Sequence, residues 1–123
     1  LYQFFADKEA LLNALAARYR EQLHRVHEEV LGDDSATLPL GELYDRAIGA
    51  LAGFHERNPG FRALFYGSAT SPSLAKASEL LHAECVHRVE GMLARRAPGL
   101  APERRRLLAT VNVEVMRALL HQA

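Results

Sequence analysis

Apolar residues recur at steps of three and four along most of the chain, which is the spacing of one face of an α-helix. The first such run comprises Leu11, Leu12, Leu15, Tyr19, Leu23, Val26 and Val30. Asp7 precedes this run and is a predicted N-cap, because its carboxylate can accept a hydrogen bond from the first helical turn. Gly32 follows the run and can adopt the left-handed backbone that often ends a helix. The pattern therefore predicts one long helix between Asp7 and Gly32.

A second helix and a short connector are predicted in the middle of the chain. The second helix should begin near Leu38 and Pro39, since proline is tolerated in a first turn, and Asn58-Pro59-Gly60 should stop it. Its apolar positions are Leu43, Ile48, Leu51 and Phe54. Residues 61–66 are rich in aromatic side chains but too few for a long helix. We expect them to form two helical turns that pack inward.

Two more long helices complete the predicted order. Ser71-Pro72 reads as an N-cap followed by an N1 proline, and Pro98-Gly99 should close the helix that they open. Its apolar positions include Leu74, Leu81, Cys85, Val89 and Met92. Ala101-Pro102 should start the last helix, with a stripe made of Leu108, Val111, Val115, Leu119 and Leu120. Nothing alternates with a period of two, so the fold class is all-α, a helical bundle.

The length and composition narrow the class of protein. A chain of 123 residues favours one domain, and 49% hydrophobic with 24% charged residues is typical of a folded chain. Fifteen Lys and Arg balance fifteen Asp and Glu, so these residues alone lack the basic excess of a nucleic-acid-binding domain. The single Cys85 suits a reducing compartment. Without a membrane span or a secretion signal in view, we expect a soluble, cytoplasmic protein.

The first twelve residues contain the most specific motif. Leu1, Tyr2, Phe5, Asp7, Lys8, Glu9 and Leu11 follow the pattern L-Y-x-x-F-x-[SDN]-K-[ED]-x-L. This stretch resembles the junction between the recognition helix and the fourth helix of TetR-family (tetracycline-repressor-like) transcription factors. More loosely, the predicted order of helices over the whole chain is similar to the regulatory body of that family.

The resemblance implies a division of the chain. Residues 1–6 would be the end of the recognition helix of an otherwise absent helix-turn-helix domain. Residues 7–123 would be the effector-binding and dimerisation domain, with its final helix missing. By family analogy, Tyr2 and Lys8 contact DNA phosphates and Phe5 packs the head onto the body; an aromatic side chain and a lysine beside a helix N-terminus suit phosphate contact. Alternatively, the aromatic residues belong to a core and Lys8 is a solvated charge.

The resemblance also implies a function, a ligand-responsive repressor that binds operator DNA as a homodimer. A small, apolar effector in the helical core would shift the long first helix and change the spacing of the paired helix-turn-helix heads. An alternative remains open: a stand-alone helical module that binds another protein through the apolar stripe of residues 107–120.

Helical bundles can enclose an apolar cavity lined by aromatic residues and a few polar groups. The predicted effector-lining residues are Phe54, Phe61, Phe65, Tyr66, His82, Cys85, Val89, Asn112 and Met116. Several of them could equally be ordinary core residues, because buried aromatic and aliphatic side chains need no ligand. Asn112 lies between two valines in an apolar stretch, and a buried amide needs a partner. It could also lie on the exposed side of its helix.

Metal binding and catalysis have little support in the sequence. His24 and His27 are three residues apart, as are His82 and Cys85, but spacing identifies no third ligand for a metal ion. The sequence contains no G-x-S-x-G elbow, H-E-x-x-H helix or glycine-rich phosphate loop. We therefore expect no metal, no cofactor and no enzymatic activity.

Overall fold

A computed structural model describes residues 2–65 and 72–122, with side chains except those of residues 2–7, 33, 34, 63, 65, 73, 121 and 122. The described chain comprises α1 (Tyr2–Val30), the 3-10 helix η1 (Asp33–Ala36), α2 (Leu40–Arg57), α3 (Pro59–Phe65), α4 (Pro72–Arg96) and α5 (Pro102–Gln122). These residues form no strand, which confirms the all-α fold class. None of the described helices is long and apolar enough to cross a lipid bilayer.

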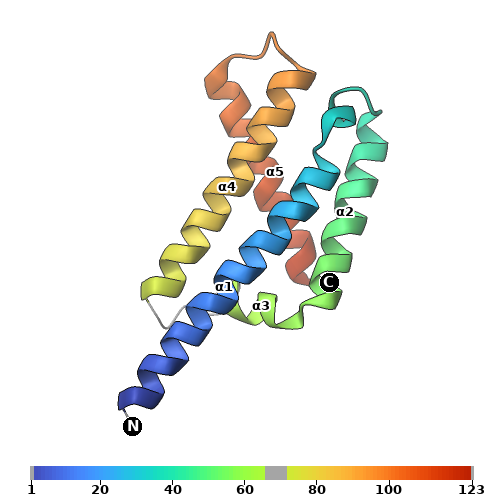
Figure 1. Cartoon of the computed structure of the whole chain (residues 1–123). Helices are drawn as coiled ribbons and strands as arrows, with labels where there is room; N and C mark the ends of the chain where they lie inside the picture. Colours follow the sequence, from blue (N-terminus) through green and yellow to red (C-terminus); the bar gives the residue numbers. More distant parts are fainter. Residues whose placement is uncertain (1, 66–71, 123) are drawn as a thin grey trace.

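The four long helices lie alongside one another, and the short α3 closes one end of the bundle (Figure 1). The first turns of α1 extend beyond the other helices at that same end. Leu11 is 69% exposed, whereas the adjacent Leu12 packs against the core, although the sequence pattern placed both on the apolar face. Prolines at the starts of α3, α4 and α5 fit the first turn, where a backbone N–H has no helical partner.

Two predicted helix ends differ from the structure. Asp7 is not an N-cap, because α1 is continuous from Tyr2 and the preceding turn already supplies carbonyl partners for the N–H groups. Gly32 does not adopt a left-handed backbone, since no described glycine has a positive φ. The chain instead tightens after α1, where the Leu31 N–H donates to the His27 carbonyl at 2.7 Å, and continues into η1.

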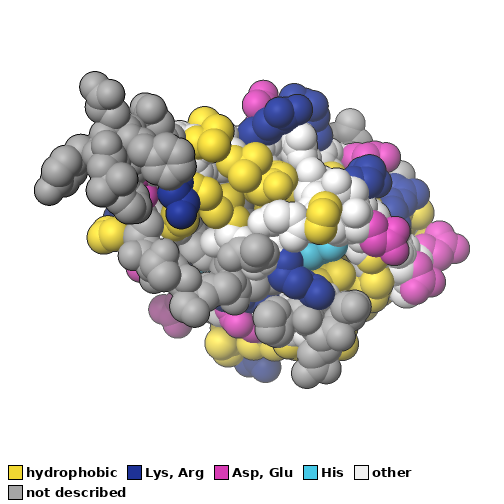
Figure 2. Space-filling view, turned by 90° about the horizontal axis from the view of Figure 1, so that it is seen from below, with side chains coloured by type: hydrophobic (Ala, Val, Ile, Leu, Met, Phe, Trp, Pro, Cys, Tyr) yellow, Lys and Arg dark blue, Asp and Glu magenta, His cyan; other side chains and the backbone are white. Residues whose placement is uncertain are grey.

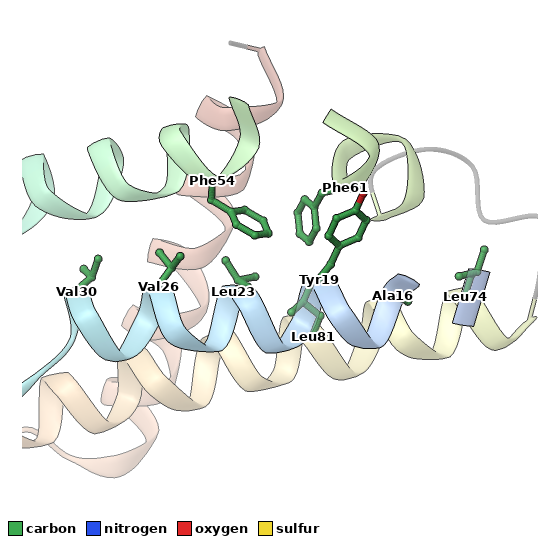
Figure 3. Packing of buried hydrophobic residues seen from close by; sticks show 9 residues of the cluster. All are labelled: Ala16, Tyr19, Leu23, Val26, Val30, Phe54, Phe61, Leu74 and Leu81. Atoms are coloured by element: carbon green, nitrogen blue, oxygen red, sulfur yellow. The ribbon is translucent and has the colours of Figure 1, made fainter. Parts of the chain in front are cut away.

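The main core lies between α1, α2, α3 and α4. Its buried residues are Ala16, Tyr19, Leu23, Val26, Val30, Phe54, Phe61, Leu74 and Leu81 (Figure 3). Phe61 of α3 meets the Tyr19 ring edge to face at a centroid distance of 5.7 Å, and the Phe54 ring at 5.0 Å. These are favourable aromatic geometries. They fix the short α3 against both α1 and α2.

The connection between α1 and α2 is held by the end of α4. Ser35 of η1 is fully buried. The Arg95 guanidinium donates to the Leu31 carbonyl at 3.1 Å and to Ser35 Oγ at 3.3 Å, and Arg96 donates to the Ser35 carbonyl at 2.9 Å. Because guanidinium groups keep their charge, such bonds are stronger than neutral ones. They connect two parts of the chain that are about 60 residues apart in the sequence.

The predicted apolar stripe of α5 lies mostly on the surface. Val111, Val115 and Leu119 are 50%, 51% and 56% exposed, and Leu108 is also exposed. Only Leu120 of that stripe is buried. The helix packs inward through its opposite face, which includes the fully buried Ala109.

Figure 2 shows the end of the bundle seen from below. Hydrophobic side chains reach the surface there, with Lys and Arg interspersed among Asp and Glu around them. The described atoms visible on this face thus form no extended surface of a single charge sign. This agrees with the balanced charge of the sequence.

Candidate ligand-binding cavity

A cavity of about 160 Å³ lies between the helices, and every α-helix contributes to its wall. The lining residues are Leu23, His27, Val30, Leu31, Leu40, Leu43, Tyr44, Ala47, Leu51, His55, Phe61, Ser78, Leu81, His82, Cys85, Val89, Met92, Asn112, Val113, Met116, Arg117 and Leu120. Most of them are apolar, and a few have polar groups. This is the composition of pockets that bind small organic molecules.

The wall has a buried apolar part and a more exposed part. Leu23 and Phe61 are 4% and 1% exposed, and Leu81 is also buried. By contrast, Leu40 and Tyr44 of α2 are 51% and 39% exposed. A bound molecule would therefore meet a closed apolar surface on one side and solvent near α2 on the other.

His55 is a polar residue at the buried part of the wall. Its Nδ1 lies 2.8 Å from the Leu51 carbonyl, one turn earlier in α2. A carbonyl oxygen can only accept, so Nδ1 is the donor. The ring also meets Phe61 edge to face at 5.3 Å and Phe54 at 5.8 Å. These contacts orient the imidazole beside the aromatic core.

Two polar pairs connect α5 with other helices at the cavity wall. The Tyr44 hydroxyl donates to Asn112 Oδ1, while Asn112 Nδ2 donates to the Leu108 carbonyl at 3.0 Å. His82 Nε2 of α4 lies 2.7 Å from Glu114 Oε1. Arg117 also approaches Glu114, at 3.9 Å. The amide and charged groups of α5 that face this region therefore already have protein partners.

His27 and Cys85 face each other across the cavity wall, with 3.9 Å between His27 Nε2 and Cys85 Sγ. Burial, and to a smaller extent the positive charge of Arg88, lower the pKa of His27 to about 4. Burial likewise raises the pKa of the Cys85 thiol to about 11, although Arg88 opposes this effect. Both side chains are uncharged near pH 7.

Charged and polar pairs outside this wall join α1 to α4. Arg20 forms an ion pair with Glu84. Arg88 donates to His24 Nδ1. Within α1, His24 Nε2 lies 3.0 Å from Glu28 of the next turn. These contacts are at the surface and are each worth only about 0–1 kcal/mol. Together with the buried wall residues, they fix the register between α1 and α4.

The structure brings together six of the predicted lining residues. These are Phe61, His82, Cys85, Val89, Asn112 and Met116. Phe54 does not line the cavity; it is 1% exposed and packs in the main core against Phe61. The side chain of Phe65 and all of Tyr66 lie outside the described residues. Contact of the six with an effector remains a prediction.

Sequence reasoning missed several lining residues, among them His27, Tyr44 and His55. His27 had a signal, because it lies four residues after Leu23 and three before Val30 on the apolar face of α1. Tyr44 had none, since exposed aromatic residues at helical positions are common. His55 directly follows Phe54 in α2 and belongs to no motif in the sequence.

The predicted DNA contacts lie away from this cavity. Lys8 is exposed near the start of α1, and the Tyr2 side chain lies outside the described residues. Phosphate contact by either residue stays a prediction. No three His, Cys, Asp or Glu side chains within the described part of the chain are arranged to hold a metal ion.

Comparison with known proteins identifies a family. The family model described as "Tetracyclin repressor-like, C-terminal domain" matches residues 39–123. These residues include α2 to α5, and with them most of the cavity wall. No curated protein and no solved structure matches the chain.

Proposed function

This chain belongs to the family of tetracyclin repressor-like C-terminal domains, and we propose that it is the regulatory part of a ligand-responsive transcription regulator. In this proposal a small, largely apolar effector occupies the cavity, and the protein represses transcription by binding operator DNA. The domain binds and responds but performs no catalysis. It acts in the cytoplasm, where the regulated DNA lies.

The observation that supports the proposal most directly is that α1 lines the cavity and also leads to the predicted junction with the DNA-reading head. Leu23 and His27 line the cavity, and Lys8 lies 19 residues before His27 in the same helix. At 1.5 Å per residue, these two positions are roughly 28 Å apart along the axis. A small tilt of α1 at the cavity would therefore displace its other end by a larger distance. The predicted junction with the DNA-reading head is at that end.

The proposed repressor acts as a homodimer through the exposed apolar stripe of α5. A second copy of the chain would cover Val111, Val115 and Leu119, whose exposure is otherwise unfavourable. Paired heads must match half-sites that are about 34–36 Å apart on DNA. An effector that prefers one tilt of α1 by a few kcal/mol is sufficient to shift the population away from that spacing.

The experiment that tests this function uses the complete gene product, including any DNA-reading head. Duplex DNA selected from a random pool should yield a sequence with two half-sites, measured by fluorescence anisotropy. Small molecules that bind the cavity should then change the affinity for that DNA. Specific DNA binding that no cavity ligand alters would contradict the regulatory role of the cavity.

The alternative, a stand-alone interaction module, has support from the same exposed stripe of α5. The two functions differ in their outcome. A repressor selects a DNA sequence, whereas a stand-alone module selects none and uses the stripe to bind a different protein.

A further inference from the structure

The volume of the cavity limits the size of its occupant. At about 160 Å³ it is close to the engineered cavity of about 150 Å³ that binds benzene in another protein. The buried part of the wall is formed by aliphatic and aromatic side chains such as Leu23, Phe61 and Leu81. The enclosed part of a ligand therefore has about the size of one six-membered ring.

The wall also determines the charge that a ligand can have. His27 and Cys85 are uncharged near pH 7, as their pKa values of about 4 and about 11 require. Arg117 lies 3.9 Å from Glu114, and the same carboxylate contacts His82, so these charges balance locally. None of the described lining residues offers an unpaired charge, so an ionised ligand would lose its hydration in the cavity without gaining a partner of opposite sign, which is costly. The cavity therefore favours an uncharged molecule.

The Tyr44–Asn112 pair determines how a ligand would be oriented in the cavity. Tyr44 is 39% exposed and Leu23 is 4% exposed, so the pair lies nearer to solvent than the apolar end of the cavity. The Tyr44 hydroxyl donates its proton to Asn112, and its oxygen keeps lone pairs that can accept a further hydrogen bond. The complementary group on a ligand is a donor, such as a hydroxyl or an amide N–H.

We infer that the cavity takes an uncharged molecule with an apolar body of about one ring and one hydrogen-bond donor, which is directed to the Tyr44 hydroxyl. This inference rests on the proposed function of the cavity as the effector site. It goes further by naming the chemistry of the effector and the position of its polar group.

The test compares four probes with one ring each at pH 7.5: benzyl alcohol, benzyl methyl ether, benzoate and benzylammonium. Binding to the intact chain is measured by ¹H–¹⁵N chemical-shift titration. Benzyl alcohol should bind at least tenfold more tightly than either ion and should shift the amides of cavity residues. Equal or tighter binding of benzoate or benzylammonium, or no binding of benzyl alcohol, would overturn the inference.

Substitutions locate the binding and identify the polar contact. Tyr44→Phe should weaken benzyl alcohol binding by about two- to tenfold, the range for one hydrogen bond, and leave benzyl methyl ether unchanged. Val89→Phe, which fills the cavity from α4, should abolish binding, whereas Ala83→Phe at an exposed position of α4 should not. Ala47→Leu fills the cavity from α2 with a smaller side chain, in case Val89→Phe does not fold.

Unchanged affinity for benzyl alcohol in Tyr44→Phe, or unchanged binding in a folded cavity-filling variant, contradicts the inferred ligand chemistry. None of these measurements uses DNA. If they fail while another kind of molecule releases the DNA, the inferred chemistry is wrong and the proposed function stands. If the probes bind as expected and DNA binding never responds to any cavity ligand, the inferred ligand chemistry stands and the proposed function is wrong.

Discussion

At the scale of single residues, Phe61 belongs to both the core and the cavity. It lines the cavity while its ring meets Tyr19 of α1 edge to face at 5.7 Å. It is 1% exposed, so the sides of its ring that do not face the cavity are closely packed against protein. A ligand that displaces the Phe61 ring would therefore also displace the Tyr19 ring of α1. In the proposed mechanism, part of the movement from the cavity to α1 passes through this pair of rings.

The start of α3 comes close to α1 at Gly60. A Cβ atom at this position would lie 2.7 Å from the Tyr19 hydroxyl oxygen and 3.7 Å from Cζ. We expect Gly60→Ala to lower the free energy of unfolding by about 1–3 kcal/mol, because the buried Tyr19 ring would have to shift. Urea unfolding followed by circular dichroism measures the change.

The matched variants separate the steric cause from helix propensity. Tyr19→Phe removes the hydroxyl, so Gly60→Ala should cost much less in that background. Gly49→Ala, which meets nothing within 4 Å in the middle of α2, should raise stability by about 0.5–1 kcal/mol. If Gly60→Ala is equally harmful with and without the hydroxyl, the contact with Tyr19 is not the cause.

The buried His27 makes the stability of the chain depend on pH. Its pKa is lowered from 6.5 to about 4 by burial, so the unfolded chain takes up this proton first as the pH falls. Its contribution to stability is complete above about pH 6.5 and is lost towards pH 4, by up to about 3 kcal/mol. His27→Gln should therefore lose less stability than the unmodified chain between pH 7 and 4.5.

Urea titrations at several pH values measure this difference. His87→Gln at an exposed position of α4 is the control and should follow the unmodified chain. Parallel curves for His27→Gln and the unmodified chain would show that His27 does not take up the proton in question.

At the scale of elements, α5 has apolar residues on two opposite faces. Ala109 and Leu120 are buried against the other helices, while Val111, Val115 and Leu119 are exposed. A helix of this kind can be covered on both faces, although helices of the described chain cover only one of them. The proposed second neighbour is the other copy of the chain.

The substitution Val111→Glu tests the exposed face. A carboxylate in the middle of an apolar interface would lose its hydration without a partner, so we expect the dimer dissociation constant to rise at least 100-fold, measured by analytical ultracentrifugation. The folded monomer should persist, because residue 111 is 50% exposed. Ile48→Glu makes the same change at a 40% exposed position of α2 and should leave the dimer intact. The same loss of dimer in both variants would argue against α5 as the contact surface.

The sequence pattern predicted the existence and order of the helices well because proline and glycine mark most of their ends. The starts of α4 and α5 at Pro72 and Pro102 were expected and are confirmed. The pattern could not decide which face of α5 points inward, since both faces are apolar. It also could not show that the first turns of α1 extend beyond the bundle, because that depends on the lengths of the neighbouring helices.

The cavity was predictable only in part. Residues on apolar faces, such as Cys85 and Met116, could be assigned from their helical spacing, and the structure places them in the wall. Leu40 and Tyr44 could not be assigned in this way, because they line the cavity from the more exposed side of α2. Phe54 satisfies the same pattern as a lining residue and yet packs in the core. Periodicity identifies the buried side of a helix but not which buried residues adjoin empty space.

At the scale of the whole molecule, the main core and α5 are attached unequally. The nine buried residues of the core cluster all belong to α1, α2, α3 and α4. The described part of α5 adds Ala109 and Leu120 as buried residues outside that cluster. Within the described chain, α5 therefore packs through one face, mainly against α4.

This difference predicts the order of local opening. In dilute monomer, the amide hydrogens of α5 should exchange with solvent faster than those in the middle of α1, since local stability follows the number of buried apolar neighbours. Hydrogen exchange measured by mass spectrometry resolves the two helices. At concentrations where the chain dimerises, the protection of α5 should rise. Equal protection of α5 and α1 in the monomer would contradict this account.

The division of the cavity wall among all the α-helices has a consequence for engineered biosensors. Val89 of α4, Val113 of α5 and Ala47 of α2 all face the ligand space but do not belong to the helix that would move the DNA-reading head. Substitutions at these positions can change which compound is detected while the output through α1 keeps its geometry. The residues that select the ligand can then be varied separately from the helix that would move the DNA-reading head. Libraries of variants for a new analyte can therefore leave α1 unchanged.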